Sequence, residues 1–298
     1  MTAAIEVRDL RMRYGGREVL RGVDFEVQSG EVFCLLGPNG AGKTTTTEIL
    51  EGFRHRTGGS VSVLGLDPAD QPARLRERIG IVLQECGFPR QARVAELIST
   101  WRGYYRAPRP LDELLEVVEL TKDRNTLVRR LSGGQRRRLD FALALAGDPD
   151  LIFLDEPTTG YDPESRRRSW AVIENLRRLG KTIFLTTHYL DEAERLADRV
   201  AILLGGRIAV NGPVHEVARR AGVQTRISFA APSCATALPP GLDIEGGTAF
   251  CHTANAGATL RELLAWAHKA GIGDLDDLSV AAPTLEDAYL RLVQEGTC

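Results

Sequence analysis

The sequence predicts an α/β fold with a mainly parallel core sheet, and two observations carry this prediction. Five short apolar runs of strand length recur along the chain, and stretches with helical periodicity separate them. These runs are largely apolar rather than alternating, as expected for parallel strands that are buried on both faces. The runs are VFCLLG at 32–37, IGIVLQ at 79–84, LIFLDE at 151–156, TIFLTTH at 182–188 and VAILLGG at 200–206.

The N-terminal segment has a different pattern, which predicts an antiparallel β-subdomain. Apolar and polar positions alternate within residues 5–36, as at Ile5 and Val7 and again at Phe25 and Val27. A period of two indicates a strand with one buried face. Glycine-containing turns interrupt the alternation, so we expect short antiparallel strands before the first parallel strand.

A helical subdomain is expected between the second and third apolar runs. The pattern from residue 84 to residue 131 is helical, and LDELLEVVEL at 111–120 places its apolar side chains on one face. We place this subdomain at about residues 88–147.

The chain is expected to divide into a main domain, residues 1–220, and a small α+β C-terminal region, residues 221–298. Proline and glycine cluster between residues 230 and 247, after a strand-like segment at 224–230. A final helix is expected within 282–296, because Thr284 and Asp287 have the spacing of a capping box.

Composition argues against nucleic acid as a partner. The chain has 298 residues, 43% hydrophobic and 26% charged, with a net charge of -2, so it lacks the basic excess of nucleic-acid-binding domains. Two basic runs, Arg136–Arg138 and Arg166–Arg168, fall on predicted helices. Three successive residues on a helix point in different directions, so we expect a solvated or salt-bridged surface there.

Cysteine usage and hydropathy indicate a protein of a reducing compartment without its own membrane span. The five cysteines are odd in number, far apart and without CxxC spacing: Cys34, Cys86, Cys234, Cys251 and Cys298. No stretch approaches the roughly 18 consecutive apolar residues of a membrane-spanning helix, and the first residues show no leader pattern. Any membrane association is therefore expected to come through a partner.

The strongest chemical signal is GPNGAGKTT at 37–45, which matches G-x-x-x-x-G-K-[ST] directly after a predicted strand. Backbone N–H groups of such a loop surround phosphate oxygens, the lysine reaches the β and γ phosphates, and the threonine ligates Mg²⁺. The alternative, a glycine-rich turn with an exposed lysine, does not explain the preceding strand. The predicted phosphate-binding residues are Gly37, Pro38, Asn39, Gly40, Ala41, Gly42, Lys43, Thr44 and Thr45.

LIFLDE at 151–156 ends in two acidic residues with distinct predicted roles. Asp155 is expected to hold Mg²⁺, together with Thr44, and Glu156 to orient or deprotonate the attacking water. Taken alone, an acidic strand end is more often a helix cap or a solvated edge. Its place downstream of a phosphate loop favours the catalytic interpretation.

LSGGQ at 131–135 places a Ser-Gly-Gly turn at the start of a predicted helix. Backbone amides at such a helix start, with the Ser132 hydroxyl, form a second anion cradle. A capped helix would need only Ser132. Two glycines weaken a helix start, so capping alone does not account for the motif.

In this order, GPNGAGKT, Gln84, LSGGQ, LIFLDEP and His188 resemble the ATP-binding cassette (ABC) ATPase family, over about residues 5–220. The resemblance implies a P-loop NTPase cassette that binds ATP and Mg²⁺ and hydrolyses ATP. It also implies head-to-tail dimerisation with a second cassette, most simply an identical chain. The nucleotide would then also contact the partner's signature loop, here Ser132, Gly133, Gly134 and Gln135.

The same resemblance assigns roles to five single residues. Tyr14 would stack on adenine, against the alternative of a partly exposed surface tyrosine. Gln84 would sense Mg²⁺ and the attacking water, and His188 would hydrogen-bond the γ-phosphate, although a lone histidine is usually structural. Asp162, in TTGYDP, would contact the opposite site, and Tyr161 departs there from the family's usual leucine. The implied catalytic set is Lys43, Gln84, Glu156 and His188, and the metal set is Thr44, Gln84 and Asp155.

Four further segments resemble the drug and antibiotic exporter ATPases of the daunorubicin-resistance and sodium-efflux type: residues 47–53, 63–68, 187–200 and 282–296. The implied function is ATP-driven efflux of a drug, antibiotic or lipid-like substrate through a separate transmembrane permease. The protein would be cytoplasmic and peripheral on the inner face of the membrane. The alternative, a soluble cassette ATPase acting on ribosomes or DNA, is disfavoured because a second cassette and a long coiled-coil insertion are both lacking. The sequence specifies neither the transported substrate nor the role of residues 221–298.

Overall fold

The computed structural model describes residues 3–82, 87, 89, 91–232, 238–272 and 274–295. The chain divides into two compact units, Met1–Val214 and His215–Cys298, each with its own hydrophobic core. Gln84 lies outside the described residues. None of the helices in these ranges is long and apolar enough to cross a membrane.

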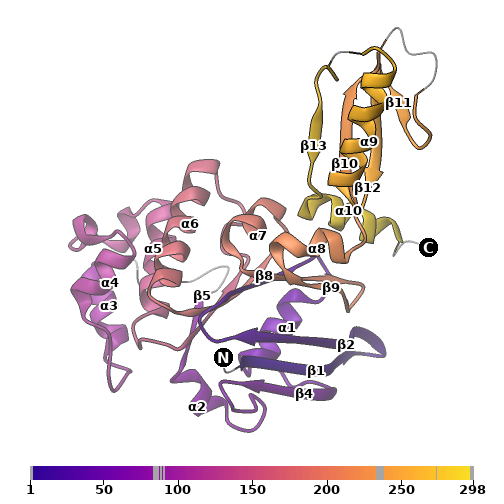
Figure 1. Cartoon of the computed structure of the whole chain (residues 1–298). Helices are drawn as coiled ribbons and strands as arrows, with labels where there is room; N and C mark the ends of the chain where they lie inside the picture. Colours follow the sequence, from indigo (N-terminus) through magenta and orange to yellow (C-terminus); the bar gives the residue numbers. More distant parts are fainter. Residues whose placement is uncertain are drawn as a thin grey trace. The chain divides into compact units, whose positions relative to one another are not determined.

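The first unit is built on a six-stranded sheet in which five strands are parallel (Figure 1). The strand order is β5-β6-β7-β3-β8-β9, and only β9 pairs antiparallel to its neighbour. Each of the five predicted apolar runs forms one parallel strand, which confirms the mainly parallel core sheet. The strands are β3 (Val32–Leu36), β5 (Ile79–Val82), β6 (Leu151–Asp155), β7 (Thr182–Thr187), β8 (Arg199–Leu204) and β9 (Arg207–Pro213).

A second, antiparallel sheet packs on this core through aromatic side chains. Its order is β2-β1-β4, from β1 (Ala3–Tyr14), β2 (Arg17–Gln28) and β4 (Gly58–Val63). Phe25 of β2 stacks on Phe33 and Phe184 of the central sheet, with ring centroids 5.3 and 5.9 Å apart. The first two strands have 12 residues each and are not the short strands predicted, because register shifts let their pairing continue past irregular positions.

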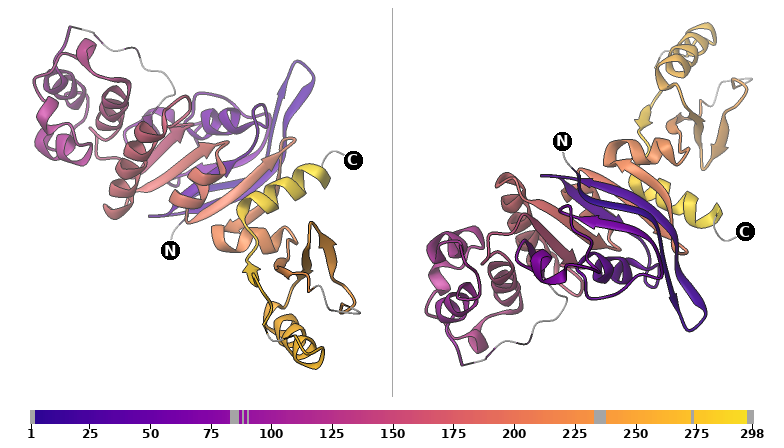
Figure 2. Two further views of the ribbon diagram at one scale, coloured as in Figure 1. Left: turned by 90° about the horizontal axis from the view of Figure 1, so that it is seen from above. Right: turned by 90° about the horizontal axis from the view of Figure 1, so that it is seen from below.

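Helices of the first unit fall into two groups (Figure 2). One group accompanies the central sheet: α1 (Lys43–Leu50), α2 (Pro72–Arg76), α6 (Pro163–Arg178) and α7 (Leu190–Leu196). The other gathers beyond the β5 edge, away from the β1–β2 hairpin: α3 (Val94–Arg102), α4 (Leu111–Val117), the 3₁₀ turns η1 (Thr121–Asp123) and η2 (Val128–Arg130), and α5 (Gly133–Ala144). This second group occupies the stretch for which a helical subdomain is predicted.

The basic run on α5 is only partly the solvated or salt-bridged surface that the sequence suggests, because Arg136 is exposed but the next two arginines are buried. Helix α5 packs against α3, α4, α6 and β5, so most of its circumference is covered. Arg137 is 3% exposed, and its Nε donates to the carbonyl oxygen of Pro157 at 3.2 Å. Arg138 is also buried and pairs with Glu119 at 3.3 Å. These guanidinium groups are internal links of the unit, which leaves little of the run available to nucleic acid.

The second unit is a small α+β structure. A four-stranded antiparallel sheet in the order β11-β12-β10-β13 packs one face against α9, through Leu263 and Ala267. The last helix begins at the predicted capping box, where Asp287 N donates to Thr284 Oγ1 at 3.2 Å. The elements are α8 (Val214–Arg220), which spans the division between the units, β10 (Thr225–Ala230), β11 (Asp243–Glu245), β12 (Thr248–Thr253), α9 (Ala256–Lys269), β13 (Ser279–Ala281) and α10 (Leu285–Glu295).

Candidate functional site

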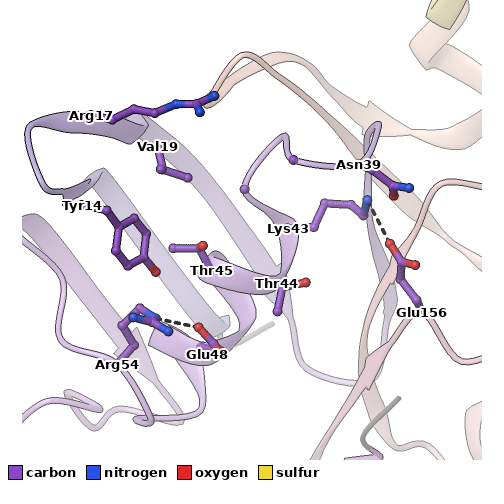
Figure 3. Close-up of a pocket in the computed structure, with 12 residues that line it drawn as sticks. Tyr14, Arg17, Val19, Asn39, Lys43, Thr44, Thr45, Glu48, Arg54 and Glu156 are labelled. Atoms are coloured by element: carbon purple, nitrogen blue, oxygen red, sulfur yellow. Dashed lines mark hydrogen bonds and ion pairs between the residues drawn. The ribbon is translucent and has the colours of Figure 1, made fainter. Parts of the chain in front are cut away.

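A cavity of about 540 Å³ opens where the loop between β3 and α1 meets the antiparallel sheet (Figure 3). The loop and the first turn of α1 form one wall, and Tyr14, at the end of β1, forms another. Glu156, directly after β6, reaches the same cavity. The carboxyl ends of neighbouring parallel strands thus deliver residues to one edge of the sheet, where ligands of open α/β sheets bind.

The sequence of the β3–α1 loop suits phosphate. Gly42 caps α1 with φ of +112°, and a Cβ atom there would lie 2.7 Å from Leu20 Cδ2, so a side chain is excluded. Gly40, Lys43, Thr44 and the N-terminus of α1 line the cavity. A helix start offers unpaired N–H groups and a positive dipole end, so this wall can hold phosphate groups.

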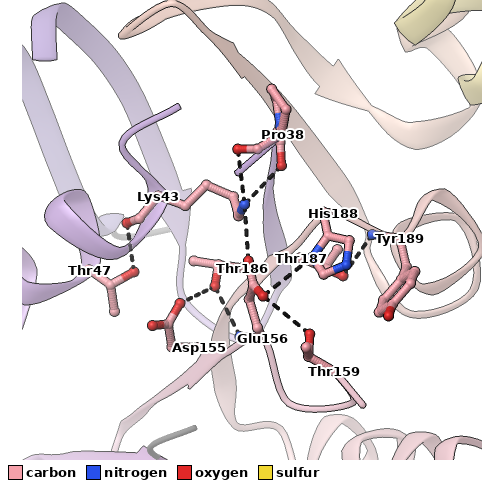
Figure 4. A network of polar contacts seen from close by, with 11 residues as sticks. Pro38, Lys43, Thr47, Asp155, Glu156, Thr159, Thr186, Thr187, His188 and Tyr189 are labelled. Carbon is pink, nitrogen blue, oxygen red and sulfur yellow. Dashed lines mark hydrogen bonds and ion pairs between the residues drawn. The ribbon is translucent and has the colours of Figure 1, made fainter. Parts of the chain in front are cut away.

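Lys43 is the best-anchored charge of the site (Figure 4). Its side chain is 4% exposed, and Nζ donates to the carbonyl oxygens of Gly37 and Pro38 at 2.8 and 3.3 Å. The same Nζ lies 3.0 Å from Glu156 Oε1. The ammonium therefore connects the phosphate loop to the acidic end of β6.

Glu156 is held by three neighbours in a backbone conformation that is unusual for its residue type. Its φ of +45° lies in the left-handed region, which turns the chain sharply after β6. Oε2 accepts a hydrogen bond from Thr159 Oγ1 at 3.1 Å and lies 3.3 Å from His188 Nδ1. Burial would raise the pKa of Glu156, but the hydrogen bond and charge of Lys43, with the charge of His188, lower the pKa below its ordinary value. The carboxylate is thus ionised at neutral pH and can accept a proton or a hydrogen bond from water.

Asp155 and Thr44 provide the oxygen atoms that a magnesium ion would need. The Asp155 carboxylate accepts hydrogen bonds from the hydroxyls of Thr186 and Thr44. Burial, reinforced by the charge of Glu156, raises the pKa of Asp155 against the effect of these hydrogen bonds. A carboxylate and a hydroxyl facing each other are hard oxygen ligands, so the pair fits Mg²⁺.

The signature-loop residues lie at the start of α5 and do not belong to this cavity. Ser132 Oγ accepts from Gln135 N at 3.2 Å, and Gln135 Oε1 accepts from Ser132 N at 2.9 Å, which forms a capping box. Ser132 and Gly133 are exposed, and Gly134 is half-buried. Within one chain, then, the phosphate loop and the LSGGQ motif form two separate sites.

Asp162 is likewise outside the cavity. It caps α6, and its Oδ1 accepts from the backbone N of Glu164 and of Ser165, both at 3.0 Å. Hydrogen bonds from Ser165 lower the pKa of this exposed carboxylate. Tyr161, at the position where leucine is expected, is half-buried, and burial raises its pKa.

Comparison with known proteins now decides the family. A family model described as ABC transporter matches residues 20–159. The chain is 36% identical to Nod factor export ATP-binding protein I of Burkholderia lata, over 97% of both chains. The chain belongs to the ABC transporter ATP-binding protein family. An ATP-binding subunit of an ABC transporter shares the fold with a TM-score of 0.65 and 29% identity, over 74% of this chain and 93% of that one. A dimeric bacterial ABC transporter cassette does so with a TM-score of 0.59 and 25% identity, over 70% and 98%.

The protein is therefore an ATP-binding subunit of an ABC transporter, and its enzymatic activity is ATP hydrolysis coupled to transport. Its cavity is lined by two of the motifs that carry the resemblance, the phosphate loop and the LIFLDEP segment through Glu156, and by Tyr14, to which the resemblance assigns adenine stacking. Structure neighbours that are cassettes of this family confirm the expected P-loop fold.

One buried carboxylate of this ABC ATPase, that of Glu192, was not predicted from the sequence. Glu192 on α7 is completely buried and accepts hydrogen bonds from Thr158 Oγ1 at 2.8 Å and Trp170 Nε1 at 3.0 Å. It thereby ties the helix that follows His188 to the loop that follows Glu156. The only signal in the sequence is its position four residues after His188, on the same segment.

Four further cavity residues were also missed: Arg17, Val19, Glu48 and Arg54. They belong to no recognised motif. Glu48 and Arg54 enter the cavity because α1 ends between them and the chain turns back there. The end of α1 was the one feature of the sequence that could have placed Glu48 and Arg54 in the cavity, and sequence patterns locate helix ends poorly.

A second buried carboxyl group, that of Glu51, should make the stability of the protein depend on pH in an unusual way. Glu51 is 3% exposed at the end of α1, where burial and then the charges of Asp155 and Glu48 raise its pKa from 4.5 to about 8. Between these values the folded chain holds a proton that the unfolded chain has released, so the free energy of unfolding falls as pH rises. Glu51→Gln should remove this loss. The gain in stability over wild type should grow by about 1 kcal/mol per pH unit between about pH 5 and 8.

Urea denaturation of both proteins at several pH values measures this difference. The exposed Glu77→Gln serves as control, because it removes a surface carboxylate of the same unit. A Glu51→Gln gain that is the same at pH 5 and pH 8 would contradict the buried, protonated state of Glu51.

Proposed function

We propose that this ABC ATPase is the motor of an exporter whose transmembrane permease is a separate chain. The observation that carries the proposal is the likeness to Nod factor export ATP-binding proteins, which extends over both units and not only over the cassette. The efflux substrate we propose is a drug, antibiotic or lipid-like molecule. In the cell, the protein would be cytoplasmic and would reach the inner face of the membrane through its permease.

We assign the chemistry to the residues gathered around Lys43. Lys43 would hold the β and γ phosphates, and Thr44 with Asp155 would hold Mg²⁺, which would neutralise phosphate charge. Glu156 would accept a hydrogen bond from the attacking water, because the ion pair with Lys43 keeps it ionised and Thr159 fixes its Oε2. Positioning and charge stabilisation carry most of phosphoryl transfer, so these contacts suffice for the role.

We propose that the active form is a head-to-tail dimer. The separation of the LSGGQ motif from the cavity of its own chain supports this, since a second chain can place its motif over the nucleotide. Ser132 and Gly133 are exposed and available for such a contact. Two identical chains would then form two complete sites. Asp162 and Tyr161 would contact the opposite chain next to these sites.

Action on ribosomes or DNA is not favoured. The chain carries one cassette, and Arg137 and Arg138 of its α5 basic run are buried among helices. Its relatives are named for export.

Two substitutions should fail in different ways. Glu156→Gln should retain ATP binding within a few-fold but lower kcat by about 10²–10³, because the isosteric amide cannot accept the proton. Lys43→Ala should weaken ATP binding itself by at least about tenfold, since a charge-assisted contact to phosphate is lost. Equilibrium ATP binding and steady-state ATPase assays on each variant separate the two. Normal turnover in Glu156→Gln would sink the role assigned to Glu156.

The exporter assignment is tested by what accompanies the protein in cells. Tagged protein recovered from gently solubilised native membranes should bring down a polytopic membrane chain together with vanadate-sensitive ATPase activity. A matched recovery with Lys43→Ala should retain the membrane chain and lose the activity, because docking does not require nucleotide. Recovery of ribosomal proteins or DNA without any membrane chain would contradict the proposal.

A further inference from the structure

We propose that Arg54 and Glu48 complete the site at its base end, where Arg54 acts as a positioning residue that holds the Tyr14 ring for stacking. This inference rests on the proposed assignment of the cavity as the ATP site. It goes beyond that assignment because it names what sets the affinity for the nucleotide base, as distinct from the phosphates.

The three side chains form one array in the cavity wall (Figure 3). The guanidinium carbon of Arg54 lies 5.0 Å from the centroid of the Tyr14 ring, which is cation–π distance. Glu48 Oε2 lies 2.6 Å from Arg54 Nε. In Figure 3, Arg54 lies on one side of Tyr14, and Val19 and Arg17 lie on the other. The ring is thus covered by a cation on one side.

The end of α1 places Arg54 there. After the helix, Gly52 turns the chain with φ of +77°, and the backbone N of Phe53 and of Arg54 both donate to the carbonyl oxygen of Glu48, at 2.9 and 3.1 Å. Glu48 therefore anchors Arg54 twice, through its carbonyl and through its carboxylate. The ion pair also raises the pKa of Arg54, so the guanidinium stays charged under all relevant conditions.

This anchoring matters because Tyr14 is 38% exposed, and an exposed ring loses rotamer freedom when a base stacks on it. A guanidinium held on one face restricts the ring in advance, which lowers the entropic cost of binding. The base would then form the outer layer of a stack of guanidinium, phenol and purine. Stacking recognises the face of a ring and not its edge, so adenine and guanine should benefit alike.

The array also links the two ends of the nucleotide through one helix. Helix α1 presents Lys43 and Thr44 to phosphate at its first turn and holds Arg54 through Glu48 near its last turn. The contribution of Arg54 is local to the base end. A ligand that consists of phosphates alone should not sense it.

The test is equilibrium binding of ATP, GTP and inorganic tripolyphosphate, each with Mg²⁺, to the full chain and its variants. Arg54→Ala should weaken ATP and GTP binding by about three- to tenfold and leave tripolyphosphate binding unchanged. In turnover, KM for ATP should rise while kcat stays the same, which a general loss of structure would not produce. Arg54→Lys keeps the charge but not the planar fork, so it should give an intermediate loss and guards against misfolding of the alanine variant.

Arg56→Ala is the matched control. Arg56 follows two residues later and pairs with Asp67 at 2.7 Å, but it does not line the cavity. This variant should bind all three ligands as wild type does. The inference is overturned if Arg54→Ala binds ATP as tightly as wild type, or if it loses tripolyphosphate to the same degree. If the wild-type chain binds neither ATP nor GTP more tightly than it binds tripolyphosphate, both this inference and the ATP-site assignment are overturned.

Discussion

The organisation of this ABC ATPase depends on the buried ammonium of Lys43. Three acceptors surround it, the carbonyl oxygens of Gly37 and Pro38 and the carboxylate of Glu156, and these belong to segments far apart in the sequence. A buried charge is tolerated only where it is paired and hydrogen-bonded, so the phosphate loop and the end of β6 are bound to a common geometry. Glu156 in turn contacts His188 and Thr159, so the positions of these side chains also depend on it. Glu192 on α7 accepts hydrogen bonds from Thr158 and Trp170 and so links α7 to the loop after Glu156 and to α6.

Parallel strands explain why these groups converge at all. β3, β6 and β7 are neighbours in the sheet, and each ends at the same edge, where the phosphate loop, Asp155 with Glu156, and His188 follow. The strand cores are fully buried and packed through aromatic rings, with Phe184 stacked on Phe33 and tilted against Phe153, so the edge is a rigid platform. The antiparallel sheet then adds Tyr14 beside this edge, and the turn after α1 adds Arg54. In the proposed assignment, the base and the phosphates of the nucleotide would bind to different layers of one unit.

Sequence patterns predicted those features of the fold and the site that depend on short segments of the chain. Apolar runs located all five parallel strands, and the phosphate loop, Asp155 and Glu156 were placed because their motifs follow directly on strands. Features set by tertiary packing were missed. Arg137 was expected at the surface, yet α5 is covered by its neighbours on most sides. Glu51, Glu192 and Arg54 carry no motif, and their burial or partners arise from contacts between segments that no short window contains. The capping box at Ser132 shows the opposite case, where one residue satisfies both a helix start and a predicted site.

In the proposed cycle, ATP joins two copies of this chain and Glu156 then starts hydrolysis. The most direct measurement is a structure of Glu156→Gln with ATP and Mg²⁺. The account predicts two chains head to tail, each ATP held by Lys43 of one protomer, with Ser132 of its partner within hydrogen-bonding distance of the γ-phosphate. A monomer with ATP bound, or a dimer in which the LSGGQ motif does not reach the nucleotide, would contradict it.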